Sequence, residues 1–460
     1  MAGGLDAACN ESSFVGREVF GAEATDRVRT FHSALLPATL RNAFRTDFYQ
    51  QLWHGIDLDG IEPDQLHVLP VVGKSAIRAA GDAARIRNGL ICDEVFTSGT
   101  TGTPLVTVRG NREQAYIREF FTTLIDKDPP SRWRRGLQIR NPYHGHQVAI
   151  PAPVHFHSIG IYDAGSFAHG RAVLASRHLD AGVDEVCSLL IGLERCLRAF
   201  TADTAEHVPH GIDGHLDAVV SFSQYLTKRW RERMELVWRA PVIDRYSLAE
   251  LFGGASSCLA CGWWHADPFL IPEVVGARSG GQLREGVGIL VLTALYPFQE
   301  AQPMVRYDSR DLVEVTHSRS CRPGEIAFKP LGRSRYGVPD PESDDWLLAP
   351  AVALEAVDEL EDIARTPRFL DAAQVSDHYR IGHPRYRVTT AISEGRSVIS
   401  FHVQARRRLR GAARRAFADN VGYRIVAAAP NLASALDSGV AGLRVVVDDH
   451  VNGDLLAHSE

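Results

Sequence analysis

The sequence predicts an α/β protein with a large N-terminal domain and a small α+β C-terminal domain. Its 460 residues exceed what one hydrophobic core usually supports, so two domains are expected. Near the C-terminus, β-type segments at 386–393, 397–404 and 443–449 accompany a basic helical segment at 405–418, which is an α+β pattern. We place the two domains at residues 1–333 and 334–460, and this boundary rests on the motif resemblance at Gly332-Arg333-Ser334 given below.

Hydrophobic periodicity predicts the other elements in order. Residues 24–53 carry apolar side chains at helical spacing and predict one or two packing helices. The remaining expected elements are a helix at 112–125, strands within 136–161, an amphipathic helix at 180–200, a strand at 216–220, a helix at 228–236 and a strand at 423–429.

Composition narrows the class of protein. The net charge of -6, with basic residues spread through the chain, does not favour a nucleic-acid partner. No apolar run approaches the roughly 20 residues of a membrane helix, and the N-terminus lacks a signal-peptide pattern. Seven cysteines, an odd number, favour free thiols or metal ligands over a disulfide framework. We expect a cytoplasmic protein without a membrane partner, and a homodimer stays open.

Residues 97–104, TSGTTGTP, form the stretch best suited to hold phosphate. Glycines let the backbone turn and bring N–H groups close to an anion, and hydroxyl side chains add donors. The stretch is not a Walker A loop, because no Gly-Lys-Ser/Thr closes it. Composition alone fits a polar hairpin loop equally well. The candidate phosphate-binding residues are Thr97, Ser98, Gly99, Thr100, Thr101 and Gly102.

This loop resembles the phosphate-loop signature of the adenylate-forming (ANL) superfamily, which includes the acyl-CoA synthetases. Leu69-Pro70-Val71 with Lys74 resembles the entry motif of the branch that holds phenylacetate-CoA ligase, coenzyme F390 synthetase and CapK-like proteins. Without that resemblance, Lys74 is a solvated lysine near a helix start. Further matches lie at 240–250, where PVIDRYSLAE resembles PV-x-D-x-Y-G-x-x-E, and at 306–312, where RYDSRDL resembles RYRTRDL.

The resemblance implies an ATP-dependent ligase that activates a small carboxylic acid, with an aromatic acid as one expectation. In adenylation a carboxylate attacks the α-phosphate of ATP. The reaction therefore requires that the phosphate charge be neutralised, that the adenosine be held rigidly and that the two anions be brought into line. The resemblance makes Glu250 the Mg²⁺ ligand, Tyr246 a border of the nucleotide and Asp311 the acceptor of the ribose hydroxyls. A carboxylate suits a diol because it accepts two hydrogen bonds. Taken alone, Asp311 is a charged residue capping a strand turn.

The remaining site residues come from shorter motifs. Ser223 lies in SFSQYLT, which resembles a nucleotide-lining SSEPLT segment, and Arg333 lies in a segment that resembles the hinge motif GRSDD. Tyr143 and His144 lie in NPYHG, which resembles the segment lining the acid pocket. Thr101 is grouped with Glu250 as catalytic.

Cysteine and histidine spacing predicts a structural zinc ion. Cys258, Cys261, His265 and Cys321 supply three thiols and an imidazole, a closed tetrahedral set with no open position. On spacing alone, buried free cysteines are an equal alternative. The resemblance implies Cys258, His265 and Cys321 as ligands, and Cys261 as the fourth is inferred from this sequence.

The C-terminal segment departs from the superfamily. By eye the usual catalytic lysine falls on Ala441, and the hinge aspartate is replaced by Arg335. CoA is the usual acceptor in the superfamily and an amine is the alternative. Because of the two departures, we expect the second half-reaction to use a nucleophile other than CoA. Two alternatives stay open: activation of nitrite for diazotisation of an aryl amine, and a catalytically degenerate nucleotide-binding protein. Arginines at 406–415 are a solvated helix face or a dock for CoA phosphate or a carrier protein.

Overall fold

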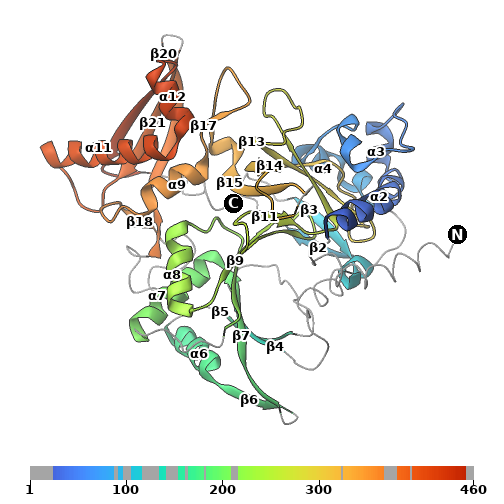
Figure 1. The fold of residues 1–460 in the computed structure, drawn as a ribbon, viewed down its shortest axis with the longest axis horizontal. Coiled ribbons are helices and arrows are strands. Elements are labelled where there is room, and N and C mark those ends of the chain that lie inside the picture. The colour runs from blue at the N-terminus through green and yellow to red at the C-terminus, as the bar shows by residue number, and fades with distance from the viewer. Residues whose placement is uncertain are drawn as a thin grey trace.

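The computed structural model describes most of the chain as a mixed α/β protein (Figure 1). The described residues are 24–86, 92–96, 105–116, 134–140, 154–160, 164–180, 183–208, 216–322, 325–366, 381–393 and 396–451. Within them, a 13-stranded sheet runs in the order β12-β13-β14-β15-β11-β10-β9-β8-β7-β4-β5, with β1 beside β14 and β6 beside β7. The helices found in this part of the chain lack the length and apolar character needed to cross a membrane.

The N-terminal segment forms a helical layer over the sheet. It contains α2 (Ala24–Ala43), α3 (Asp47–Leu52), the 3₁₀ helices η1 (Pro63–Val68) and η2 (Gly81–Ala84), β1 (Val72–Gly73) and α4 (Lys74–Ala80). Leu36, Leu40 and Ala43 are buried at helical spacing, and Thr46 caps α3 by accepting a hydrogen bond from the Tyr49 N–H. The prediction of one or two helices in this range is thus confirmed, with two found, and they share one core with β12–β15.

A parallel part of the sheet follows. Its elements are β4 (Arg134–Arg140), β5 (Val154–Gly160), α6 (Ala164–Ala175), β6 (Arg177–Asp180), β7 (Val183–Leu193), α7 (Glu194–His207), β8 (Ala218–Phe222), α8 (Lys228–Trp238) and β9 (Val242–Ser247). Strands β5, β4, β7, β8 and β9 pair in parallel, so their carboxyl ends share one edge. The strands predicted at 136–161 and 216–220 and the helix at 228–236 are confirmed.

The helix predicted at 180–200 is wrong in its first half. Residues 183–193 form β7, and the helix begins only at Glu194. A strand covered on both faces reads as a continuous apolar run, here Leu189-Leu190-Ile191, and periodicity cannot separate such a run from a buried helix. Of the helix predicted at 112–125, residues 111–116 are helical and the rest lies outside the described residues.

The second half of the sheet is antiparallel. It comprises β10 (Gly254–Ser257), β11 (Trp264–Ala266), β12 (Leu270–Val275), β13 (Gly286–Ala294), β14 (Tyr307–Thr316) and β15 (Ala327–Arg333). A separate hairpin joins β2 (Cys92–Phe96) to β3 (Val106–Gly110). Strand β1 pairs in parallel with β14, and this pairing brings the start of α4 beside the middle of the sheet.

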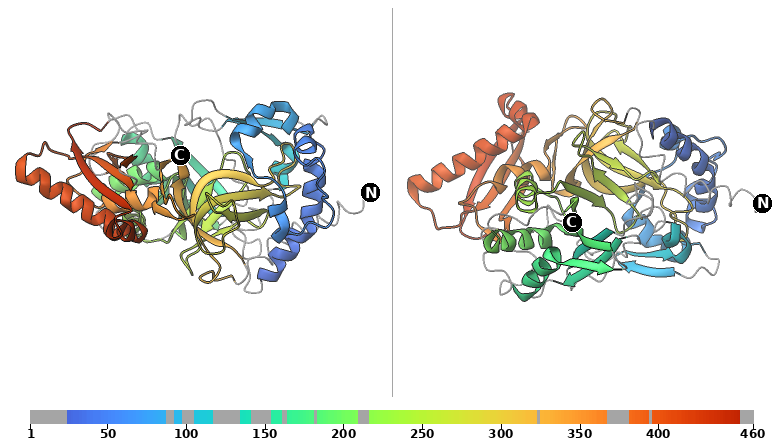
Figure 2. Two further views of the ribbon diagram at one scale, coloured as in Figure 1. Left: turned by 90° about the horizontal axis from the view of Figure 1, so that it is seen from above. Right: turned by 60° about the horizontal axis from the view of Figure 1, so that its bottom comes forward.

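The C-terminal part has its own core and forms a smaller domain, as predicted. It contains η3 (Ser334–Tyr336), β16 (Val338–Pro339), β17 (Trp346–Leu348), α9 (Pro350–Asp358), β18 (Arg365–Thr366), β19 (His383–Pro384), β20 (Tyr386–Ser393), β21 (Arg396–Gln404), α11 (Gly411–Ala428), α12 (Pro430–Asp437) and β22 (Ala441–Asp448). Figure 2 shows its three-stranded sheet at the end of the molecule opposite α2. The boundary at residue 333 stays a prediction.

Two predictions within this part are corrected. The basic helix begins at Gly411, not at 405, and the strand predicted at 423–429 is the second half of the same helix, α11. Phe417, Val421 and Ile425 are buried at four-residue spacing, so one helical face packs on the sheet throughout. The strands predicted at 386–393, 397–404 and 443–449 are confirmed as β20, β21 and β22.

Candidate functional site

Five charged or phenolic side chains from separate elements meet at the centre of the large sheet. Lys74 begins α4, Tyr246 lies on β9 and Glu250 lies in the turn after β9. Asp311 lies on β14 and Arg333 ends β15. We call these five residues the central cluster. Its members Tyr246, Glu250, Asp311 and Arg333 are the predicted site residues that the structure brings together.

Asp311 is fixed from two sides. The Tyr246 hydroxyl donates a hydrogen bond of 2.7 Å to Oδ2, and Arg333 Nε lies 3.3 Å from Oδ1. Asp311 and Arg333 face each other directly in the β14–β15 register. Arg333 also donates to the Ser309 carbonyl at 2.7 Å, which holds its guanidinium in place. Each carboxylate oxygen still has a lone pair for a ligand hydroxyl.

Burial is the largest influence on the pKa values of Asp311 and Tyr246. It raises the pKa of Asp311, while the Arg333 charge and the Tyr246 hydroxyl act in the opposite direction. Burial, followed by the Asp311 charge, raises the pKa of Tyr246 well above its usual value. Tyr246 is therefore a phenol throughout the physiological range and donates its proton toward Asp311.

Glu250 forms an ion pair with Lys74, a residue that the sequence without the family resemblance predicts to be solvated. Lys74 Nζ lies 2.9 Å from Glu250 Oε1, and Glu250 is only 5% exposed. Burial opposes ionisation, but the Lys74 ammonium and its hydrogen bond outweigh it and lower the pKa of Glu250. Tyr307 also hydrogen-bonds to Glu250. The interpretation of Lys74 as solvated is thus wrong, and the only sequence signal for its pairing is the LPV-x-x-K motif.

The hairpin around the predicted phosphate loop approaches Glu250. Phe96 pairs with Val106 at the loop end of the hairpin. On β3, Arg109 donates a hydrogen bond of 2.9 Å to the Ala249 carbonyl, next to Glu250. The loop residues Thr97, Ser98, Gly99, Thr100, Thr101 and Gly102 and the pocket residues Tyr143 and His144 lie outside the described residues.

Ser223 lies apart from the direct contacts of the central cluster. It follows β8 with a φ of 84°. Its strand pairs in parallel with β9, where Phe222 faces Arg245, the residue before Tyr246. Ser223 therefore stands at the carboxyl edge of the parallel strands, the edge at which α/β proteins bind ligands.

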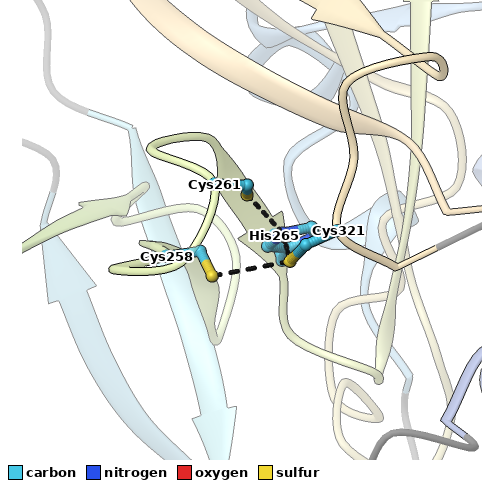
Figure 3. Close-up of side chains that lie close together, drawn as sticks. All are labelled: Cys258, Cys261, His265 and Cys321. Atoms are coloured by element: carbon cyan, nitrogen blue, oxygen red, sulfur yellow. Dashed lines mark hydrogen bonds between the residues drawn. The ribbon is translucent and has the colours of Figure 1, made fainter.

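The four predicted zinc ligands come together in a second cluster (Figure 3). Their ligand atoms lie within 4.8 Å of one another. Cys258 Sγ is 3.6 Å from Cys321 Sγ, and His265 Nε2 is 3.3 Å from Cys261 Sγ and 3.4 Å from Cys321 Sγ. Zinc–sulfur bonds of about 2.3 Å and zinc–nitrogen bonds of about 2.0 Å give a tetrahedron with edges of roughly 3.5–3.8 Å. The observed separations are close to these edges.

A tight turn between β10 and β11 presents two of the cysteines. Gly262 donates from its N–H to the Cys258 carbonyl at 2.8 Å and has a φ of 72°, which a glycine adopts without strain. The N–H groups of Cys261 and Ala260 donate to Cys258 and lower its pKa against the effect of burial. His265 follows on β11, and Cys321 comes from the loop between β14 and β15.

The histidine is suited to metal ligation. Burial, helped by the Arg322 charge, lowers the pKa of His265 to about 4, so the imidazole is neutral at pH 7. Its other nitrogen, Nδ1, lies 3.8 Å from the Glu325 carboxylate. Cys321 is exposed and Cys258 half-buried, whereas Cys187 and Cys196 are buried core thiols. These four side chains could therefore hold a zinc ion.

Comparisons with known proteins place the fold. No family model and no curated protein matches the sequence. Among solved structures, an open conformation of 2-hydroxyisobutyryl-CoA ligase in complex with 2-HIB-AMP and CoA aligns over 95% of this chain and 91% of its own, with 15% identity and a TM-score of 0.67. The same ligase in the postadenylation state with R3-HIB-AMP aligns over 95% and 89%, with 14% identity and a TM-score of 0.64.

A third structure is an ATP-bound RpMatB–BxBclM chimera. It aligns over 79% of this chain and 66% of its own, with 14% identity and a TM-score of 0.52. Identities this low show a shared fold only. The chain therefore has the fold of the acyl-CoA ligases of the adenylate-forming superfamily.

Proposed function

We propose that this protein is an ATP-dependent ligase that converts a small carboxylic acid, with aromatic acids as the first candidates, into its acyl-adenylate and passes the acyl group to a nucleophile. The observation that carries the proposal is the central cluster. Four residues singled out by motif come from distant parts of the chain and meet there with a lysine. The motifs at Leu69–Lys74 and 240–250 support the phenylacetate-CoA ligase branch.

In this proposal Asp311 and Tyr246 bind the nucleoside. The Asp311 carboxylate accepts the two ribose hydroxyls, because Arg333 and Tyr246 hold it in one orientation. Glu250 is ionised and would hold Mg²⁺, a cation that prefers carboxylate oxygens and neutralises phosphate charge when bound. The glycine- and threonine-rich loop at 97–104 contributes donors to the same phosphates.

Lys74 supplies a further positive charge. By eye Ala441 occupies the position of the superfamily lysine, and Arg424, a cation of the same domain that could replace it, forms an ion pair of 3.1 Å with Glu359. Lys74 is already beside Glu250, so its ammonium can neutralise charge that develops on the phosphates without movement of the C-terminal domain.

The first prediction tests this arrangement. Lys74→Ala should lower the rate of pyrophosphate release by about 100-fold or more, because one preorganised donor is lost from the transition state. Glu250→Ala and Thr101→Ala should weaken ATP binding, measured by calorimetry with Mg²⁺. The matched control is Lys228→Ala, which removes a solvated lysine paired loosely with Glu232. Wild-type rates in Lys74→Ala would refute the role of the lysine.

The hydrogen bonds between α9 and residues 225–228 are relevant to the choice of acceptor for the acyl group. Glu355 accepts hydrogen bonds from the Tyr225 hydroxyl at 3.0 Å and the Lys228 N–H at 2.9 Å. Asp358 is fully buried and accepts from the Thr227 hydroxyl at 2.6 Å. A buried group left without its partner costs about 1–3 kcal/mol. Rotation of the C-terminal domain would break these bonds, which supports an acceptor other than CoA, such as an amine.

The second prediction concerns this acceptor. The intact protein should transfer its acyl group to a primary amine, tested as a panel of aryl amines and amino acids, faster than to CoA. Amide and thioester yields from the same acid and ATP concentrations measure the two routes, and the same amines mixed with the free acyl-adenylate give the uncatalysed background. 2-Hydroxyisobutyryl-CoA ligase has been solved with CoA, so CoA is the competing acceptor. Efficient CoA-dependent thioester formation would overturn the amine proposal.

The third prediction identifies the acid. A pyrophosphate-release screen should respond most strongly to small aryl acids, less to aliphatic acids and least to nitrite. A response to nitrite alone would replace carboxylate activation with nitrite activation. Tight ATP binding without any pyrophosphate release would instead indicate a degenerate nucleotide-binding protein.

We further propose that Cys258, Cys261, His265 and Cys321 hold a structural Zn²⁺. The four donors match tetrahedral zinc in type and spacing, and no position is left for a substrate. Four such ligands need reduced thiols, which favours a reducing compartment such as the cytoplasm.

The fourth prediction is that the purified protein contains about one equivalent of zinc by elemental analysis, consistent with a closed four-ligand site. Cys261→Ser should reduce the zinc content and the melting temperature together, because binding and folding are coupled. Cys187→Ala, which changes a buried cysteine elsewhere, should retain the zinc. A metal-free protein of unchanged stability would show that the cluster is not a metal site.

A further inference from the structure

A pocket of about 310 Å³ opens at one edge of the three-stranded C-terminal sheet. The ends of β21 and β22 and the segment that joins β21 to α11 line it. None of its lining residues belongs to the central cluster or the cysteine cluster. Its volume is at the lower end of the range of about 300–1,000 Å³ that is usual for small-molecule sites.

The topology around this pocket is that of a ligand-binding βαβ unit. β21 and β22 are parallel neighbours, and α11 and α12 connect them (Figure 1). Their carboxyl ends and the N-terminus of α11 therefore lie at the same edge. Ligands of α/β units bind at this edge.

The lining is strongly basic. Arg406, Arg407, Arg408 and Arg414 face it with two aspartates, Asp448 and Asp449. The aspartates already have partners, since Asp448 Oδ2 is 2.9 Å from His402 Nδ1 and Asp449 Oδ2 is 3.6 Å from Arg408. The Arg407 guanidinium has no acceptor in the part of the chain that the structure describes.

The arginines of this region are thus not one solvated helix face. Arg406, Arg407 and Arg408 precede α11, while Arg410 and Arg415 do not line the pocket. Arg414 donates to the Val447 carbonyl, so the first turn of α11 is attached to the end of β22. The guanidinium fork matches phosphate in geometry and binds it with two parallel hydrogen bonds.

We propose that this pocket binds the phosphate group of a small anionic molecule, held by Arg407 and Arg408. The phosphate could belong to a nucleotide or to free pyrophosphate. The two sources share one chemistry, and the experiment separates them. The proposal does not depend on adenylation, because the pocket lies outside the central cluster.

Calorimetric titration of the full chain tests the proposal, with adenosine 3′,5′-bisphosphate and inorganic pyrophosphate as separate probes. The double variant Arg407→Ala/Arg408→Ala should weaken binding by about tenfold or more, because charge-assisted hydrogen bonds to the phosphate are lost. The matched control, Arg410→Ala/Arg415→Ala, removes the same charge from the same region and should bind as the wild type does. These side chains are exposed, so both variants should fold, which circular dichroism verifies.

If the bisphosphate binds and its binding is lost only in Arg407→Ala/Arg408→Ala, the ligand is a nucleotide. If only pyrophosphate behaves in this way, the ligand is the free anion. Failure of both probes to bind at millimolar concentration overturns the proposal. Equal weakening in the two double variants also overturns it, because bulk charge would then explain the binding. If Glu250→Ala abolishes binding of the probe, the probe occupies the central cluster and the pocket assignment is wrong.

Discussion

The buried carboxylate of Asp311 is the constraint on which the central cluster depends. A carboxylate leaves water only at a large cost unless charge and hydrogen bonds compensate it. Arg333 and Tyr246 provide that compensation, and they can do so only because β14 faces β15 in one register while β9 reaches the same point from the parallel half. The large sheet therefore places the site, and a shift of one residue in that register would turn Asp311 to the other face.

Charge compensation also explains the second half of the cluster. Glu250 is buried beside Lys74, and the ammonium favours the ionised carboxylate. In the ligase proposal both charges act on the phosphates and the bound cation. The five residues of the central cluster all precede residue 334, which is consistent with the proposal that the C-terminal domain brings no lysine to the reaction. α9 fits this interpretation, because its buried contacts through Asp358 fasten the small domain to residues 225–228.

In this interpretation the small C-terminal domain still has a proposed role in binding. Its parallel strand pair and basic pocket have the features of an anion site, while its own core keeps the sheet rigid. The cysteine cluster lies elsewhere, at the β10–β11 turn and the loop that carries Cys321. The three proposed roles, nucleotide recognition, zinc binding and anion binding, therefore fall in three separate regions.

The sequence by itself was sufficient for the fold class and for the motifs that hold Tyr246, Glu250 and Asp311, because each motif lies within one continuous segment. It also named the four residues of the cysteine cluster, but only the tertiary structure brings Cys321 to the other three. It could not determine that residues 183–193 form a strand, since a buried apolar run is ambiguous. The sequence also could not show that Lys74 pairs with Glu250, or which arginines line the pocket and which face the solvent. These features depend on strand pairings between segments far apart in the chain, and only the tertiary structure brings such segments together.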